Sequence, residues 1–132
     1  MVSDKLGLEE GMTFSPSFDR DGLIPAIASD HMSGEILMFA WMNADALAKT
    51  IETRTAYFWS RSRNKLWQKG EESGNVLRVK EMRTDCDQDV VWLRVEVEGD
   101  GLACHTKRET CFYRVVDTDA TGTSLRFVVK AE

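Results

Sequence analysis

The sequence predicts an α+β fold that is rich in β-strands and has one principal helix. Residues 91–98 alternate between apolar and polar side chains, which is typical of a strand with one buried face. Several other short apolar or aromatic runs are bounded by Gly, Pro, Ser or Asn, as strands usually are. Only after Asn43 do apolar residues at helical spacing follow a capping residue. Because the chain has 132 residues and no internal repeat, we expect one domain over residues 1–132 with its own core.

The start of the chain is expected to form an arm followed by two strands. Residues 1–17 are mixed in character and end in Ser-Pro-Ser, so we expect an N-terminal arm with one helical turn. A strand is predicted over residues 23–28, where Pro25 indicates an edge position or a strand start. A second, strongly apolar strand is predicted over residues 35–41.

The principal helix is expected to follow directly. The Asn43 side chain can cap a helix that continues to about Thr53. Apolar residues at this spacing form one face of a helix, and that face is expected to pack on the core. The residues assigned to it are Ala44, Leu47, Ala48 and Ile51.

The second half of the chain is expected to consist of strands separated by turns. Residues 69–75 contain two glycines and are predicted to form a loop. Residues 117–132 are predicted to form a C-terminal extension. The strands predicted here cover residues 55–60, 76–82, 91–97, 111–116 and 125–130, with a strand or loop at Cys104.

Charge and hydropathy argue against several classes of protein. The net charge of −5, from 17 basic and 22 acidic residues, argues against a general nucleic-acid binder. No apolar run reaches the ~18–20 residues of a membrane span, so we expect no membrane segment. The chain opens without a charged-then-apolar signal segment and has three cysteines, so we expect a protein of the reducing cytoplasm.

The three cysteines stand in distinctive surroundings. Cys86 lies inside Asp85-Cys86-Asp87-Gln88-Asp89, Cys104 precedes His105, and Cys111 opens an aromatic segment. The odd count argues against a disulfide framework. One interpretation makes the cysteines small buried hydrophobic residues, because their spacing matches no common zinc-finger pattern. The other makes them zinc ligands, and three protein ligands would leave a fourth position free for a catalytic water.

The carboxylates around Cys86 suggest a second metal. Three carboxylates within five residues repel one another, and a divalent cation such as magnesium relieves that repulsion. On a strand, Asp85, Asp87 and Asp89 would share one face while Cys86 points to the other, which would keep zinc and magnesium ligands apart. The alternative is a solvated turn that carries no ion.

His105 has two interpretations. On an extended segment Cys104 and His105 would face opposite ways, which favours His105 as a catalytic base near the metal rather than as a second ligand. The other interpretation is that His105 has a structural role and is held by hydrogen bonds. His31, in a polar turn, is expected to be a solvated loop residue.

Residues 60–71 combine cations, hydroxyls and an indole. They fit a solvated edge strand or a nucleic-acid patch of cations interleaved with aromatic rings. They also fit a site for one small phosphorylated molecule, with Arg and Lys on phosphate and Trp67 on an apolar face. Gly70 and Gly74 would let the backbone approach the anion. Spacing does not choose among these three.

Taken together, the segments resemble the phosphoribosyl-AMP cyclohydrolase family of histidine biosynthesis over residues 18–116. The resemblance is specific because several motifs occur in order at consistent spacing. They are Gly22-Leu23-Ile24-Pro25-Ala26-Ile27-Ala28, Gly34-Glu35-Ile36-Leu37-Met38-Phe39-Ala40-Trp41-Met42-Asn43, Ser60-Arg61-Ser62-Arg63, Lys65-Leu66-Trp67, Lys69-Gly70-Glu71, Ser73-Gly74, Asp85-Cys86-Asp87-Gln88-Asp89, Ala103-Cys104-His105-Thr106 and Cys111-Phe112-Tyr113-Arg114.

The resemblance implies a mostly antiparallel rolled sheet in an intertwined homodimer with sites at the subunit interface. It implies one Zn²⁺ per subunit, held by Cys86 of one subunit and by Cys104 and Cys111 of the other. It also implies Mg²⁺ on Asp85, Asp87 and Asp89. The candidate substrate-binding residues are Arg61, Arg63, Lys65, Trp67, Lys69, Glu71 and Ser73.

The implied reaction is hydrolysis of the adenine N1–C6 bond of a phosphorylated nucleotide. Zinc-activated water would attack C6, with His105 as the candidate base, while magnesium and the cations of residues 61–69 would hold the phosphates. The main alternative is a zinc-stabilised interaction or nucleotide-binding module without catalysis. A zinc deaminase is a further alternative, but its His-x-Glu and Pro-Cys-x-x-Cys motifs are absent from the sequence.

Overall fold

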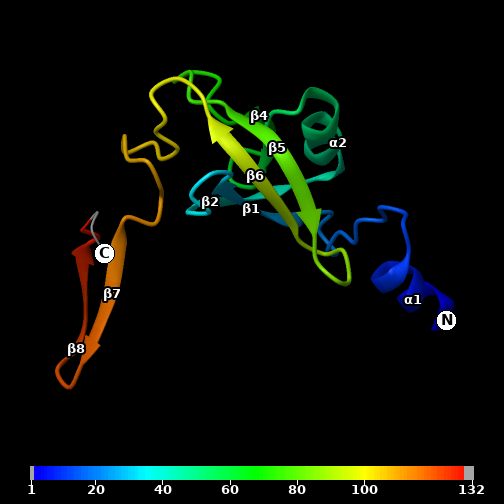
Figure 1. The fold of residues 1–132 in the computed structure, drawn as a ribbon, viewed down its shortest axis with the longest axis horizontal. Helices are drawn as coiled ribbons and strands as arrows, with labels where there is room; N and C mark the ends of the chain where they lie inside the picture. Colours follow the sequence, from blue (N-terminus) through cyan, green and yellow to red (C-terminus); the bar gives the residue numbers. More distant parts are fainter. Residues whose placement is uncertain (1, 130–132) are drawn as a thin grey trace.

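The computed structural model describes residues 2–129, while positions 1 and 130–132, parts of the predicted arm and extension, lie outside this range. Two helices and eight strands form from the described residues (Figure 1). This confirms a strand-rich α+β fold. The elements are α1 (Val2–Glu10), β1 (Ile24–Asp30), β2 (Ile36–Met42), α2 (Ala44–Thr53), β3 (Tyr57–Ser60), β4 (Lys65–Gln68), β5 (Leu77–Thr84), β6 (Val91–Val97), β7 (Arg114–Asp119) and β8 (Gly122–Phe127).

A four-stranded sheet in the order β2-β1-β6-β5 forms the centre of the fold. Strand β1 pairs antiparallel with β2 and parallel with β6, and β5 pairs antiparallel with β6. On β6, Val91, Leu93 and Val95 are fully buried, while Trp92 is half-buried and Glu96 is exposed. The alternation predicted for this strand is therefore confirmed, and its apolar face supplies the middle of the core.

A β-bulge explains the mixed pattern of β5. Leu77 and Val79 are buried opposite β6. The register then shifts between Val79 and Glu81, so Lys80 is the extra residue of the strand. Beyond the bulge, Met82 returns to the core side and pairs with Leu93. Apolar side chains thus occur at both parities, although they pack on one face.

Helix α2 begins and ends where its capping residues predict. The Asn43 side chain accepts a hydrogen bond from the Ala46 N–H at 2.8 Å, which satisfies one of the free donors of the first turn. At the other end, Arg54 adopts a left-handed conformation and its N–H donates to the Thr50 carbonyl at 2.8 Å. The predicted bounds of this helix are confirmed.

The buried face of α2 differs from the prediction. Ala46, Leu47 and Thr50 are buried. Thr50 can lie in the core because its hydroxyl donates to the Ala46 carbonyl at 2.8 Å and accepts from the Tyr57 N–H at 2.9 Å. The spacing of apolar residues cannot reveal a threonine that is buried because its hydroxyl is hydrogen-bonded. The predicted buried face is therefore wrong, and the observed face is displaced from it by about one residue around the helix. The residues predicted to face the core but exposed are Ala44, Ala48 and Ile51.

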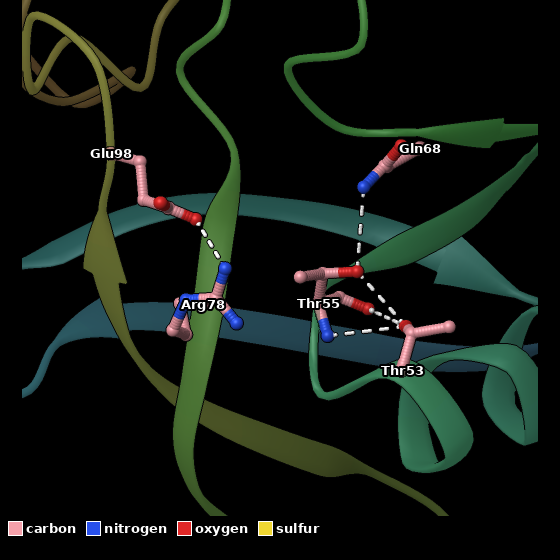
Figure 2. Close-up of polar contacts among 5 residues, drawn as sticks. All are labelled: Thr53, Thr55, Gln68, Arg78 and Glu98. Atoms are coloured by element: carbon pink, nitrogen blue, oxygen red, sulfur yellow. Dashed lines mark hydrogen bonds and ion pairs between the residues drawn. The ribbon is translucent and has the colours of Figure 1, made fainter.

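Threonines join the end of α2 to the β3–β4 hairpin, as Figure 2 shows. The Thr53 and Thr55 hydroxyls lie 2.9 Å apart, and the Gln68 amide donates to Thr55 Oγ1 at 3.4 Å. Nearby, Arg78 on β5 and Glu98, just beyond the end of β6, form an ion pair at 2.9 Å. Strand β4 was not predicted, because its two polar ends conceal its short apolar centre.

The prediction of one principal helix is wrong, because the N-terminal arm contains α1, a nine-residue helix. Figure 1 places it at one end of the molecule, apart from the sheet. The Leu6 side chain is 56 % exposed. The side chains described for this helix, at residues 6–10, are exposed or half-buried, and a helix with no strong apolar stripe gives no periodic signal in the sequence.

The C-terminal strands form a hairpin with bounds different from those predicted. Strand β7 starts at Arg114 instead of 111 and passes through the predicted boundary at 117, and β8 ends at Phe127. Position 130, the end of the predicted last strand, lies outside the described residues. The turn forms because the Asp119 carboxylate accepts from the Thr121 N–H at 2.8 Å and from its hydroxyl at 2.6 Å. In Figure 1 the hairpin projects away from the central sheet.

Candidate active site

A pocket of ≈ 1020 Å³ lies where β2, the β3–β4 hairpin and two loops meet. All seven residues predicted to bind substrate line it, together with Cys104 and His105. Cys86, Cys111 and the three predicted magnesium ligands do not. The lining comprises Phe39, Ala40, Trp41, Trp59, Ser60, Arg61, Ser62, Arg63, Lys65, Trp67, Gln68, Lys69, Gly70, Glu71, Glu72, Ser73, Asn75, Asp100, Leu102, Cys104, His105 and Lys107.

The β3–β4 hairpin carries most of the cations of the pocket. Its turn is stabilised by the Ser60 hydroxyl, which accepts from the Arg63 N–H at 3.2 Å, and by Asn64, whose φ of 52° is one that asparagine tolerates. Strand β4 is anchored where Trp67 packs on the buried Phe58 ring at 5.3 Å. The exposed arginines and lysine of the hairpin therefore stand on a fixed base.

A second loop, residues 69–75, closes the pocket on the side of Lys69. Gly70 has a φ of +87°, and a side chain there would collide with the backbone of Asn75. Asn75 is buried and its Oδ1 accepts from the Asp100 N–H at 2.8 Å. The Gly74 N–H is used inside the loop, donating to the Gly70 carbonyl at 2.8 Å, so this amide does not face an anion.

The cysteine loop, residues 104–111, holds two thiols together. The Cys104 N–H donates to the Arg108 carbonyl at 3.0 Å, which folds the loop back on itself. The Cys111 N–H donates to the Leu37 carbonyl at 2.7 Å, and this bond attaches the end of the loop to β2. Thr110 reinforces the attachment through its hydroxyl, which donates to the Ile36 carbonyl at 2.7 Å. Cys104 therefore lies in a turn and not on a strand.

The two thiols of this loop interact with each other. Burial has the largest single effect on the pKa of Cys104 and raises it. Hydrogen bonds with Thr106 and Cys111, together with the charge of Lys69, outweigh burial, so the pKa of Cys104 is lowered overall. The Cys111 residue is exposed overall, yet desolvation of its thiol, followed by the hydrogen bond to Cys104, raises the pKa of Cys111 to about 11. The Cys104 sulfur also lies 3.0 Å from the Thr106 hydroxyl. Two thiols in one loop offer the sulfur donors that a thiophilic cation prefers.

The acidic loop, residues 85–89, is a turn, so of the two interpretations the strand that would separate Cys86 from the carboxylates is not formed. Asp85 Oδ1 accepts from the backbone N–H groups of Asp89 at 3.0 Å and Val90 at 3.1 Å, which curls the segment. The ligand atoms of Asp85, Cys86 and Asp87 consequently lie within 4.8 Å of one another.

The carboxylates of the acidic loop crowd one another. Hydrogen bonds with Asp85 and Asp87, followed by desolvation and their negative charges, raise the pKa of Asp89 to about 6. A proton shared among carboxylates marks a place where a divalent cation would be stabilised. Within residues 2–129, the sulfur of Cys86 belongs to this group and not to the thiol pair of the cysteine loop.

Several residues that line the pocket were not predicted from the sequence. Trp41 forms a wall where the Arg61 guanidinium lies over its ring at 4.9 Å, and Phe39 meets the same indole edge-on at 5.4 Å. Alternation along β2 places these two rings on one face, a signal that could have found them. Asn75 and Lys107 carry no such signal, because only the folded loops bring them to the pocket.

No helix within the described part of the chain is long and apolar enough to span a membrane.

Comparison with known proteins gives the family. Residues 38–113 match the family model described as phosphoribosyl-AMP cyclohydrolase. A protein of that name from Brucella anthropi is 56% identical over 123 residues, which cover 93% of this chain and 87% of the relative. The Mesorhizobium japonicum protein of that name is 58% identical over 92% of this chain and 80% of its own length. The chain belongs to the phosphoribosyl-AMP cyclohydrolase family.

Proposed function

We propose that the protein is a metal-dependent hydrolase that opens the adenine ring of phosphoribosyl-AMP at the N1–C6 bond in histidine biosynthesis. The observation that supports this most strongly is the pocket itself. It brings several cationic side chains together with Cys104 and His105 in one cavity. A phosphorylated nucleotide can therefore bind by its phosphates while its base lies against the cysteine loop.

Charge supports a substrate with more than one phosphate. The pocket is lined by five cationic side chains and three carboxylates. Arginine and lysine recognise phosphate oxygens, arginine by a bidentate fork. Trp41 and Trp67 supply aromatic surface beside them, on which a base can stack. The cations are Arg61, Arg63, Lys65, Lys69 and Lys107.

Zinc fits the donor atoms of the cysteine loop. Cys104 and Cys111 offer sulfur ligands from one chain, and a second copy would supply Cys86 as the third, giving one zinc per subunit in a homodimer. Thiolate-bound zinc supplies Lewis acidity that lowers the pKa of a coordinated water toward about 7. His105, directly after Cys104 and exposed to the pocket, is the residue we assign to accept a proton from the attacking water.

The C-terminal hairpin supports a dimer in which subunits exchange segments. A two-stranded hairpin is marginally stable in isolation, and large exposed apolar side chains usually mark an interface. Every described residue of β8 is exposed, including Leu125 at 53 % and Phe127 at 59 %. Val116 on β7 is 65 % exposed. We assign a second copy of the chain as the partner of this hairpin, which would give the intertwined dimer and complete the rolled sheet.

Magnesium fits the acidic loop through Asp85, Asp87 and Asp89. Their oxygens suit a hard cation, and the raised pKa of Asp89 reports the crowding that such an ion would relieve. When bound, magnesium supplies positive charge that neutralises phosphate. The chain contributes the remaining orientation through the pocket cations, which fix the phosphate ends of the substrate.

Pocket variants test the proposal against a matched control. Arg61→Gln removes a pocket cation, and Arg78→Gln removes an exposed arginine that pairs with Glu98 outside the pocket. We expect Arg61→Gln to raise KM for phosphoribosyl-AMP at least tenfold, because a charge-assisted phosphate contact is lost. Arg78→Gln should leave KM unchanged. Equal effects of the two variants would contradict the assignment of the pocket as the substrate site.

A further inference from the structure

Gln88 lies in the acidic loop, but its side chain is buried and points away from the solvent that surrounds its neighbours. It is 4 % exposed, whereas Asp87 and Asp89 are exposed. Its Oε1 accepts from the Ser15 N–H at 2.6 Å. Its Nε2 donates to the carbonyl of Leu8 at 3.1 Å and to that of Thr13 at 3.4 Å.

The backbone of Gln88 makes a further bond to the same arm. Its carbonyl accepts from the Ser17 N–H at 2.7 Å. Its φ of 58° is a left-handed conformation that a non-glycine residue adopts only when neighbouring contacts maintain it. This conformation turns the amide toward residues 8–17 while the flanking carboxylates face outward. One residue therefore joins the N-terminal arm to the acidic loop by four hydrogen bonds.

The arm contributes little to the core by other means. Met12 is fully exposed and Phe14 is 42 % exposed. Phe18, just beyond the arm, is partly buried against the core cluster. Because none of the side chains described in residues 6–17 belongs to the buried core, the main structural connection of this segment is the polar attachment at Gln88.

We propose that Gln88 is a positioning residue, and that it uses residues 8–17 as a brace to hold the acidic loop in its metal-binding arrangement. This inference rests on the proposed magnesium site at Asp85, Asp87 and Asp89. Replacing a residue that holds metal ligands in place commonly lowers metal affinity about 10–100-fold, because the ligands are then no longer fixed in their binding arrangement. The N-terminal arm is then part of the metal site, although it supplies no ligand.

The test uses Mn²⁺ as the probe on the zinc-loaded, full-length protein. Gln88→Met keeps the length of the side chain and removes its hydrogen bonds. Ser15→Pro removes the backbone N–H that donates a hydrogen bond to Gln88 Oε1, and it leaves Gln88 itself unchanged. Ser15→Ala keeps that N–H and is the matched control. Free Mn²⁺ is measured by electron paramagnetic resonance, and release of the arm is measured by endoproteinase Glu-C cleavage after Glu10, a bond that none of these variants alters.

We expect Gln88→Met and Ser15→Pro to weaken Mn²⁺ binding about tenfold or more and to accelerate cleavage after Glu10. Ser15→Ala should change neither quantity. Saturating Mg²⁺ should restore turnover in Gln88→Met, which a loss of folding would not allow. If Gln88→Met does not fold, Ser15→Pro decides the question alone.

Release of the arm with unchanged Mn²⁺ affinity would overturn the proposal, because the brace would then be irrelevant to the metal. A wild-type protein that binds no Mn²⁺ would overturn both this inference and the magnesium assignment. Turnover of phosphoribosyl-AMP by the same preparation separates those failures from a failure of the proposed reaction.

Discussion

Alanine at Gly70 tests whether the loop of residues 69–75 positions the side chains of the pocket. A Cβ atom at Gly70 would approach the backbone of Asn75 and Val76 more closely than the 3.0 Å that real Cβ atoms keep. Backbone cannot swing aside as a side chain can, so the loop must shift by about 1 Å to accommodate the methyl group. Lys69 moves with it, because it precedes Gly70 directly.

Gly74 supplies the matched control. Its φ of +83° is close to the +87° of Gly70, so alanine at either position incurs a similar backbone cost of about 1–2 kcal/mol. A Cβ at Gly74 has no heavy atom within 4 Å. The difference between the two variants therefore isolates the displacement of the loop from the cost of a left-handed alanine.

We expect Gly74→Ala to lose about 1–2 kcal/mol of unfolding free energy with little change in kcat/KM. Gly70→Ala should lose more stability and on the order of 10²-fold in kcat/KM, as a displacement of about 1 Å can cost. Urea unfolding and steady-state turnover of phosphoribosyl-AMP measure the two quantities. Equal losses of kcat/KM in both variants would refute the reasoning that this loop positions the pocket.

Four further predictions follow from the site and the fold. Cys104→Ser should lose zinc, measured by metal analysis, together with turnover; full activity would contradict the proposed role of zinc. His105→Ala should keep its zinc and lose about 10²–10⁴-fold in kcat, whereas loss of the metal would make His105 a support of the ligands. Leu125→Glu should give monomers that bind zinc poorly in sedimentation and metal analyses, while Ser124→Glu on the same strand should remain dimeric. Asp30→Ala should lower the melting temperature more at pH 7 than at pH 3, and equal losses at both would contradict a lowered pKa of Asp30.

The sign of the Asp30 effect follows from its hydrogen bonds. The N–H of Ser33, followed in smaller measure by its hydroxyl and the N–H of Met32, lowers the pKa of Asp30 from its ordinary 3.8 despite partial burial. The Ser33 N–H lies 2.7 Å from Oδ2. A lowered pKa means that the stabilisation is present above pH 3.8 and disappears as the pH falls through the folded-state value.

The spacing of apolar residues in the sequence was sufficient to predict the elements at the centre of the fold. Strict alternation in β6 and the Asn43 cap of α2 are local signals, and the structure confirms both. The failures have physical causes that a pattern of apolar residues does not contain. Thr50 is buried because three hydrogen-bonding groups meet at its hydroxyl, and the side chains described for α1, at residues 6–10, are not buried in the core.

The candidate site was predicted unevenly for similar reasons. The cations of residues 61–69 and the Cys104-His105 pair are visible as motifs, and the structure brings them to one pocket. For the acidic loop the sequence left a strand and a solvated turn open, because alternating Asp and Cys imitate strand parity; Asp85 bonds to the backbone of Val90 and makes a turn. Gln88 looks like an ordinary polar residue, since its partners lie 71–80 positions away in the sequence.

The measurement that tests the central claim most directly is the absorbance change as purified protein converts phosphoribosyl-AMP. We predict turnover that a chelator abolishes and that added zinc restores in the presence of magnesium. The product should be the ring-opened nucleotide, formed by cleavage of the N1–C6 bond without release of ammonia. Absence of turnover in a folded, zinc-loaded dimer supplied with magnesium would contradict the account.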